Sequence, residues 1–240
     1  MKTQAIEFQK VEKSFGKVHA VKSLSLSIEP GCFVGLIGHN GAGKSTMMSM
    51  LMGLLKPTQG TLCVHGVDVV ANPREARKLV GAVPEEPALF EYLTGREYLE
   101  YVAEIRGGGD LQSALELTGL GNAADRLIRE YSQGMRRKTA FAAALLGDPK
   151  ILVLDESLNG LDPPSAARVK QQLRAFVDAG GTVLLSTHVI DTIEKVADRV
   201  IMLAHGRVVV DEMTKTLPEG GLESLFLTRL AETHQAGEDE

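Results

Sequence analysis

The sequence predicts an α/β fold built on a parallel sheet, and three observations support it. Short apolar, β-rich runs recur along the chain, at residues 21–29, 32–38, 60–66, 150–156, 182–187 and 199–203. Helical patterns separate the last three of these runs, as a parallel sheet covered on both faces requires. The chain has 240 residues, of which 44% are hydrophobic, and this suffices to bury the core of one large domain.

Helical periodicity replaces the strand signals between residues 86 and 149. The segment LTGREYLEYVAEIRG contains a capping box from Thr94 to Glu97, and the amphipathic piece DLQSALELTGL follows it. We therefore expect a helical insertion at about 86–149 within a single domain of residues 1–230. The acidic end of the chain, GEDE, predicts a disordered tail over 231–240.

Composition limits the classes of partner and the cellular compartment. The net charge of -5, from 26 basic and 31 acidic residues, argues against a surface devoted to nucleic acid. Cys32 and Cys63 lack the spacing of metal ligands or of a disulfide framework, which favours a reducing cytoplasm. No apolar run approaches the roughly 20 residues of a membrane helix, and the start MKTQAIEFQK lacks the apolar segment of a secretion signal.

A glycine-rich segment, GHNGAGKST, follows the predicted strand at 32–38 and begins a predicted helix. It matches the phosphate-binding pattern G-x-x-x-x-G-K-[ST] over Gly38, His39, Asn40, Gly41, Ala42, Gly43, Lys44 and Ser45, and Thr46, which follows, is a further candidate for binding the nucleotide. Glycines allow successive backbone N–H groups to surround a phosphate, Lys44 reaches the outer phosphates, and the Ser45 hydroxyl can ligate Mg²⁺. The alternative is a glycine-rich turn that caps a core helix.

The run ILVLDE places two carboxylates at the end of a buried strand. Ligands of open α/β folds bind at the carboxyl ends of the strands, so Asp155 and Glu156 are expected there. Asp155 would hold Mg²⁺ through water, and Glu156 would orient or deprotonate an attacking water molecule. The alternative is an acidic strand end that faces solvent. Nucleotide hydrolysis is the hypothesis that follows.

Five motifs occur in a fixed order, namely residues 38–46, YSQGM at 131–135, ILVLDE, NGLD at 159–162 and STH at 186–188. In this order and spacing the chain resembles the ATP-binding subunit of ABC transporters, along nearly its whole length to about residue 230. The resemblance implies a P-loop NTPase (RecA-like) core, an antiparallel β-subdomain and a helical subdomain. It also implies that ATP and Mg²⁺ are the cofactors and that ATP hydrolysis powers a membrane transporter.

The resemblance assigns roles to single residues near the nucleotide. Phe15, in KSFGKVHAV, would stack on adenine, although an ordinary half-buried aromatic at a strand end is the alternative. His188 would contact the γ-phosphate and keep water and Glu156 aligned, although a lone histidine at a strand end is usually structural. The catalytic candidates are Glu156, His188 and Lys44.

The resemblance further implies a head-to-tail dimer with a second copy or a related subunit. Each ATP would lie between the glycine-rich loop of one copy and the helix start at Ser132, Gln133 and Gly134 of the other. The positive end of that helix would stabilise the γ-phosphate only in the docked pair, so that ATP drives dimerisation. Asp162 would reach across the dimer and connect the two sites.

Two residues depart from the pattern of the family. Gln133 stands where the family has a glycine, which bears on how closely the loop approaches the nucleotide. Glu85 stands where the family commonly has a glutamine that ligates Mg²⁺. A carboxylate at this position attracts Mg²⁺ more strongly but adds negative charge near the phosphates; the alternative is a plain loop acid.

The resemblance implies integral membrane subunits as partners, at the inner face of the cell membrane. Phe90 and Tyr92, after Glu85, are candidates for the dock of a coupling helix, and either could equally belong to the core. The pieces YSQGM, PEEPALF and SLNGLDP are most similar to multidrug, sodium or polysaccharide exporters. Two alternatives are a soluble ABC-type ATPase without a transporter, as in iron–sulfur assembly, and a non-hydrolysing regulator, which Gln133 and Glu85 would suit.

Overall fold

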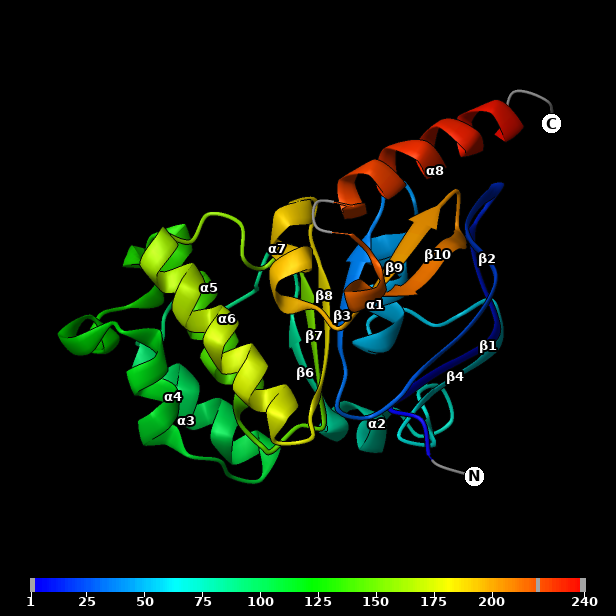
Figure 1. The fold of residues 1–240 in the computed structure, drawn as a ribbon. Coiled ribbons are helices and arrows are strands. Elements are labelled where there is room, and N and C mark those ends of the chain that lie inside the picture. Colours follow the sequence, from blue (N-terminus) through cyan, green and yellow to red (C-terminus); the bar gives the residue numbers. More distant parts are fainter. Residues whose placement is uncertain (1–2, 219–220, 238–240) are drawn as a thin grey trace.

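The computed structural model describes residues 3–218 and 221–237, which form two β-sheets and the helices around them (Figure 1). The six-stranded sheet has the order β10 (Arg207–Met213), β9 (Arg199–Ala204), β3 (Phe33–Ile37), β8 (Thr182–Ser186), β7 (Ile151–Asp155) and β6 (Val80–Val83). The four-stranded sheet has the order β2 (Val18–Ile28), β1 (Ile6–Phe15), β4 (Gln59–Val64) and β5 (Val67–Asp68). The fold class predicted from the sequence is thereby confirmed, including the antiparallel sheet.

Five strands of the larger sheet are parallel, and only β10 pairs antiparallel at one edge. Successive side chains of a strand point to opposite faces. In β3, Val34 and Leu36 therefore enter the core between the two sheets, while Phe33 and Ile37 enter the core under the helices. All five residues of β3 are buried, which explains why its sequence is continuously apolar rather than alternating.

Helix α1 (Lys44–Leu51) fills the space between the two sheets and contacts β7 and β2. Its side chains Met47, Met48 and Met50 are fully buried. Unbranched, flexible methionines can fill the irregular gap where two twisted sheets meet a helix. The start of α1 is thus fixed against the end of β3.

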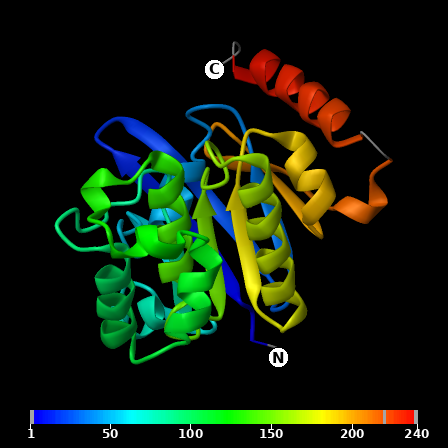
Figure 2. The same cartoon turned by 90° about the vertical axis from the view of Figure 1, so that its left-hand side faces the viewer.

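Helices cover the opposite face of the parallel sheet, and Figure 2 shows this side. They comprise α5 (Gln133–Leu145), α6 (Pro163–Asp178) and α7 (Ile190–Val196), all of which supply side chains to one core cluster. Helices α3 (Gly95–Arg106) and α4 (Leu111–Thr118) pack on α5 and share a smaller core with it. Helix α2 (Pro73–Leu79) leads from β5 to β6.

Residues 86–149 are described throughout and contain α3, α4, α5 and two 3-10 turns, as the predicted helical insertion requires. The capping box of α3 is present: the Thr94 hydroxyl accepts from the Glu97 amide at 3.2 Å, and the Glu97 carboxylate accepts from the Thr94 amide at 2.8 Å. Helix α5 begins after Ser132, whose hydroxyl accepts from the Met135 amide at 3.3 Å.

The C-terminal part of the chain differs from the predicted tail. Helix α8 (Gly221–Gly237) begins with the fully buried Leu222 against α7 and β9 and then projects from the body (Figure 1). Residues 231–237 are therefore helical, not disordered as predicted, and 238–240 lie outside the described residues. Across the described ranges, the helices are too short or too polar to cross a bilayer.

Candidate active site

The site lies where three neighbouring parallel strands end. Strand β8 lies between β3 and β7, with Ser186 in register with Leu36 on one side and with Asp155 on the other. Because parallel strands end at the same edge of a sheet, the segments that follow them must meet there. The glycine-rich loop, the acidic pair and the STH segment are brought together in this way.

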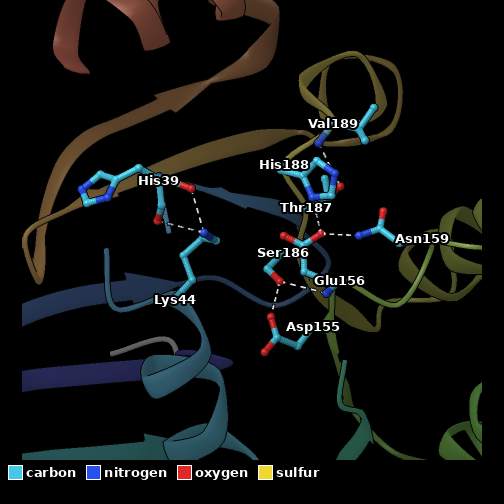
Figure 3. Close-up of polar contacts among 10 residues, drawn as sticks. His39, Lys44, Asp155, Glu156, Asn159, Ser186, Thr187, His188 and Val189 are labelled. Atoms are coloured by element: carbon cyan, nitrogen blue, oxygen red, sulfur yellow. Dashed lines mark hydrogen bonds and ion pairs between the residues drawn. The ribbon is translucent and has the colours of Figure 1, made fainter. Parts of the chain in front are cut away.

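The glycine-rich loop needs glycine at position 43. Gly43 has φ of 105°, in a region that disfavours side chains, and a Cβ there would lie 2.5 Å from the carbonyl oxygen of Ala20. The Lys44 ammonium lies across the loop and donates to the carbonyl oxygens of Gly38, at 2.7 Å, and His39, at 3.2 Å (Figure 3). The loop is thus closed on itself by the lysine side chain.

Lys44 is buried at the base of the site. Burial lowers the pKa of its ammonium, and the negative charges of Glu156, Asp155 and Glu85 oppose that shift. The three carboxylates outnumber this cation. A ligand with several negative charges, such as a nucleotide phosphate chain, would therefore need a divalent cation beside it as well as the Lys44 ammonium.

Ser186 connects the Asp155 carboxylate to the backbone of Glu156. Its hydroxyl donates a short hydrogen bond to Asp155 and accepts one from the Glu156 amide at 3.1 Å. Glu156 has φ of 46°, which is uncommon for a residue other than glycine. The bond to Ser186 therefore helps to hold Glu156 in a strained turn out of β7.

The Glu156 carboxylate faces two polar side chains, from the STH and NGLD segments (Figure 3). Its Oε2 lies 3.0 Å from Nδ1 of His188 and accepts from Nδ2 of Asn159 at 2.7 Å. The Glu156 side chain is 13% exposed and that of His188 is 69% exposed. Glu156 therefore lies at the floor of the site and His188 at its rim.

These residues line one pocket of about 670 Å³, within the range of sites that bind small ligands. The predicted residues along its wall are Phe15, Asn40, Gly41, Ala42, Gly43, Lys44, Ser45, Thr46, Glu85, Glu156 and His188. Phe15 ends β1 and is 49% exposed, with the Lys13 ammonium 5.1 Å from its ring centroid. A larger hollow of about 900 Å³ over the antiparallel sheet contains none of the predicted site residues in its lining.

Seven predicted residues do not line this pocket: Gly38 and His39 of the glycine-rich loop, Asp155, and the residues Ser132, Gln133, Gly134 and Asp162. Ser132 and Gln133 are exposed at the start of α5. Asp162 caps α6 by accepting from the Ser165 amide at 2.9 Å, and hydrogen bonds from the Ser165 hydroxyl and amide lower the pKa of this carboxyl. Asp155 is buried behind Glu156. Within one chain, the two predicted phosphate-binding segments thus face different places.

Sequence reasoning missed Ser186 and Asn159 as parts of the site. Both lie inside quoted motifs, but their roles depend on contacts between β7, β8 and the loop before α6. The sequence signal for Ser186 is weak. It is a polar residue at the end of a buried strand, and another buried strand ends in two carboxylates.

A strand that leads through a glycine-rich loop into a helix, beside a strand that ends in two carboxylates, defines a nucleotide-binding domain of the P-loop class. The family model described as ABC transporter matches residues 21–159. The chain belongs to this family.

Curated relatives and solved structures agree with this assignment. The daunorubicin/doxorubicin resistance ATP-binding protein DrrA of Streptomyces peucetius is 38% identical over 99% of this chain and 74% of its own length. The Nod factor export ATP-binding protein I of Mesorhizobium japonicum is 38% identical over 93% of this chain and 65% of its own length. A dimeric ATP-binding cassette in a post-hydrolysis state, bound to ADP and Pi, aligns with a TM-score of 0.79 and 26% identity over 87% of this chain and 98% of its own.

Proposed function

We propose that this chain binds and hydrolyses ATP to power an exporter, as a subunit attached to membrane partners. The observation that carries the proposal is the single pocket in which the glycine-rich loop and Lys44 face Glu156 and His188. Phosphoryl transfer needs a phosphate cradle, a cation and a group that positions water, and these residues supply all three. Similarity to proteins named for drug resistance and Nod factor export supports the direction of transport.

Four residues of the pocket would each have a separate role in ATP binding and hydrolysis. Phe15 would stack on the base at the pocket mouth, and Lys44 would leave the loop carbonyls for the β- and γ-phosphates. Glu156 would accept the proton of the attacking water, and His188 at the rim would contact the γ-phosphate. Each of these roles requires the side chain to reach the same volume, and the four line it together.

The oxygen atoms at the site fit Mg²⁺ delivered with the nucleotide. Ser45 and Glu85 line the pocket, and Asp155 lies behind it with its carboxylate bonded to Ser186. Among the described residues, no cluster of three or more His, Cys, Asp and Glu side chains is arranged to hold a metal ion alone. Mg²⁺ commonly binds through one or two protein oxygens together with substrate phosphates, which this set can provide. Bound there, it would neutralise charge that develops on the phosphates.

A second copy would complete the site. The start of α5 presents Ser132 and Gln133 to solvent, and the N-terminus of a helix attracts anions. These residues lie outside the pocket of their own chain, which supports a head-to-tail dimer in which they would contact the ATP held by the partner. Asp162, at the start of α6, would then lie near the dimer contact.

Membrane subunits would dock beside the helical insertion. Phe90 is 54% exposed and Tyr92 is 80% exposed, so the alternative that either belongs to the core is wrong. The Phe90 ring packs edge-on against Tyr98 and Tyr101 of α3, at centroid distances of 6.1 and 5.4 Å. Exposed aromatic side chains held in fixed positions are typical anchors of protein interfaces.

Cross-linking tests the shared site directly. Asn40→Cys and Gln133→Cys are introduced into separately tagged chains, with Cys32 and Cys63 replaced by alanine and Glu156→Gln added to prolong the ATP-bound state. We expect a short bismaleimide to join the two tags only with ATP and Mg²⁺, since the nucleotide brings the two segments together. Ser113→Cys, exposed on α4, serves as the control in place of Gln133→Cys. No cross-link between the two tags with ATP and Mg²⁺, or equal cross-linking by the Ser113→Cys control, would contradict the dimer.

Glu85→Gln tests whether the pocket carboxylate acts on Mg²⁺. Glu85 lines the pocket and is one of the charges that act on Lys44. We expect the Mg²⁺ concentration for half-maximal turnover to rise about threefold to tenfold, because a neutral amide attracts the cation less than a carboxylate does. Turnover at limiting Mg²⁺ measures the effect, with Glu86→Gln as the adjacent control. Equal Mg²⁺ dependence in the two variants would leave Glu85 as a plain loop acid.

A further inference from the structure

The side chain of Asn159, the first residue of the NGLD segment, holds the Glu156 carboxylate through a hydrogen bond to which the motif assigns no role. Its Nδ2 lies 2.7 Å from Oε2 of Glu156. A carboxylate only accepts hydrogen bonds, so the amide must present its NH₂ group and not its oxygen to Glu156. A bond from a neutral donor to an ionised acceptor is stronger than one between neutral groups.

The backbone fixes Asn159 on both sides. Its amide donates to the carbonyl oxygen of Glu156 at 3.2 Å, which closes a turn directly after β7. Three residues later, Asp162 caps α6 through the Ser165 amide. Gly160 between them lies under the Arg137 guanidinium of α5, since a Cβ at Gly160 would be 2.9 Å from Nη1. Asn159 is therefore anchored from β7, α6 and α5 together.

The two neighbours of the Glu156 carboxylate differ in how firmly they are placed. His188 is largely exposed at the rim, at the start of a segment that leads to α7, whereas Asn159 is part-buried within the anchored turn. Both side chains contact the same atom of Glu156, Oε2 (Figure 3). Held in this way, the carboxylate presents its other oxygen, Oε1, as the acceptor for water.

We infer that Asn159 is a positioning residue for hydrolysis, which keeps Oε1 of Glu156 directed at the attacking water when His188 moves towards the phosphate. The inference rests on the proposed ATP hydrolysis and adds a residue to it. Proton transfer depends steeply on the alignment of the acceptor, so the loss of one fixed donor lowers the rate without changing ATP affinity. A residue needed only for the turn would not act in this way.

Two substitutions of Asn159 test its role as a hydrogen-bond donor separately from its role in the turn after β7. Asn159→Asp keeps the size of the side chain and is as suited to turns as asparagine, but it cannot donate and places a carboxylate against Glu156. Asn159→Ala removes the donor without adding charge. We expect kcat to fall about tenfold to a hundredfold in Asn159→Ala, and further in Asn159→Asp, with the KM for ATP unchanged.

A second readout follows the lifetime of the dimer instead of the release of phosphate. A chain that binds ATP but hydrolyses it slowly should persist as an ATP-bound dimer, so light scattering with ATP and Mg²⁺ should show a longer-lived dimer for Asn159→Asp than for the unaltered chain. Asn122→Asp, exposed in the turn after α4, controls for added charge. In a chain that already carries Glu156→Gln, Asn159→Asp should lower ATP turnover no further, because the carboxylate that Asn159 positions has been removed.

The outcomes distinguish the inference from the proposed function. An Asn159→Asp variant with the kcat of the unaltered chain would overturn the positioning role, and so would a raised KM with unchanged kcat. If the unaltered chain bound ATP with Mg²⁺ but did not hydrolyse it even with its membrane partners, the proposed function would fail and the inference with it.

Discussion

Replacing Glu156 by glutamine is expected to reduce ATP turnover about 10²- to 10⁴-fold, the usual contribution of a general base. Glutamine has the same shape, so it can occupy the floor of the pocket between Asn159 and His188. An amide cannot take a proton from water, however, and the reaction loses its acceptor. ATP affinity should stay within about twofold, because Lys44 and the glycine-rich loop are unchanged. Phosphate release and calorimetry measure the two quantities.

The same variant should accumulate as an ATP-bound dimer, since hydrolysis is the step that separates the pair. Light scattering with ATP and Mg²⁺ should give twice the mass of the chain, and ADP should return it to the monomer. Glu75→Gln, on the exposed face of α2, removes an equal charge far from the pocket and should behave as the unaltered chain does. Turnover by Glu156→Gln near that of Glu75→Gln would remove Glu156 from the reaction.

Replacing Lys44 by alanine is expected to weaken ATP binding about tenfold to a hundredfold. The magnitude corresponds to one or more hydrogen bonds between charged groups, about 1.5–3 kcal/mol each. Burial removes water from the Lys44 ammonium and thereby lowers its pKa. A phosphate bound in the loop would provide the negative charge and hydrogen-bond acceptors that stabilise the ammonium in place of water. Calorimetry with ATP and Mg²⁺ measures the loss, and turnover should fall at least as much.

Two further variants test whether the weaker ATP binding comes from the loss of the ammonium and not from a loss of stability or of any surface charge. Lys44→Met keeps much of the aliphatic stem in its buried place and removes only the ammonium, so it should lose ATP affinity as Lys44→Ala does while melting close to the unaltered chain. Lys78→Ala removes an exposed cation that pairs with Glu75 on α2 and should leave ATP affinity unchanged. Full affinity in Lys44→Met would show that the loop amides alone bind the phosphates.

The sequence predicted the core strands because their residues are buried on both faces. The residues ILVL of β7 are continuously apolar before the run ends in Asp155, so the run differs clearly from the helical segments around it. The helix starts at Thr94 and Ser132 were equally predictable, since capping depends on neighbouring residues alone. The glycine-rich loop belongs to this group, because its function requires backbone N–H groups close together in the chain.

Other strands carry little signal of their own. Strand β6 has only four residues, VGAV, and Gly81 within it is required because a Cβ would collide with the carbonyl oxygen of Ala144 in α5. Strand β1 mixes charged and apolar residues and bends at Lys10, where φ is 49°. Both form because a neighbouring strand supplies hydrogen bonds and a helix or sheet covers them, which is tertiary information.

The amino-acid sequence by itself determined which residues can bind phosphate, ligate Mg²⁺ and accept a proton, because those capacities depend on side-chain chemistry and on short spacings. Only the tertiary structure decided that Ser186 supports Glu156 and that Asn159 holds its carboxylate. It also decided that Phe90 and Tyr92 face outward and that the start of α5 lies outside the pocket of its own chain. The physical reason is the order of strands: β8 lies between β3 and β7, and packing across the sheet fixes that neighbourhood, which local sequence does not encode.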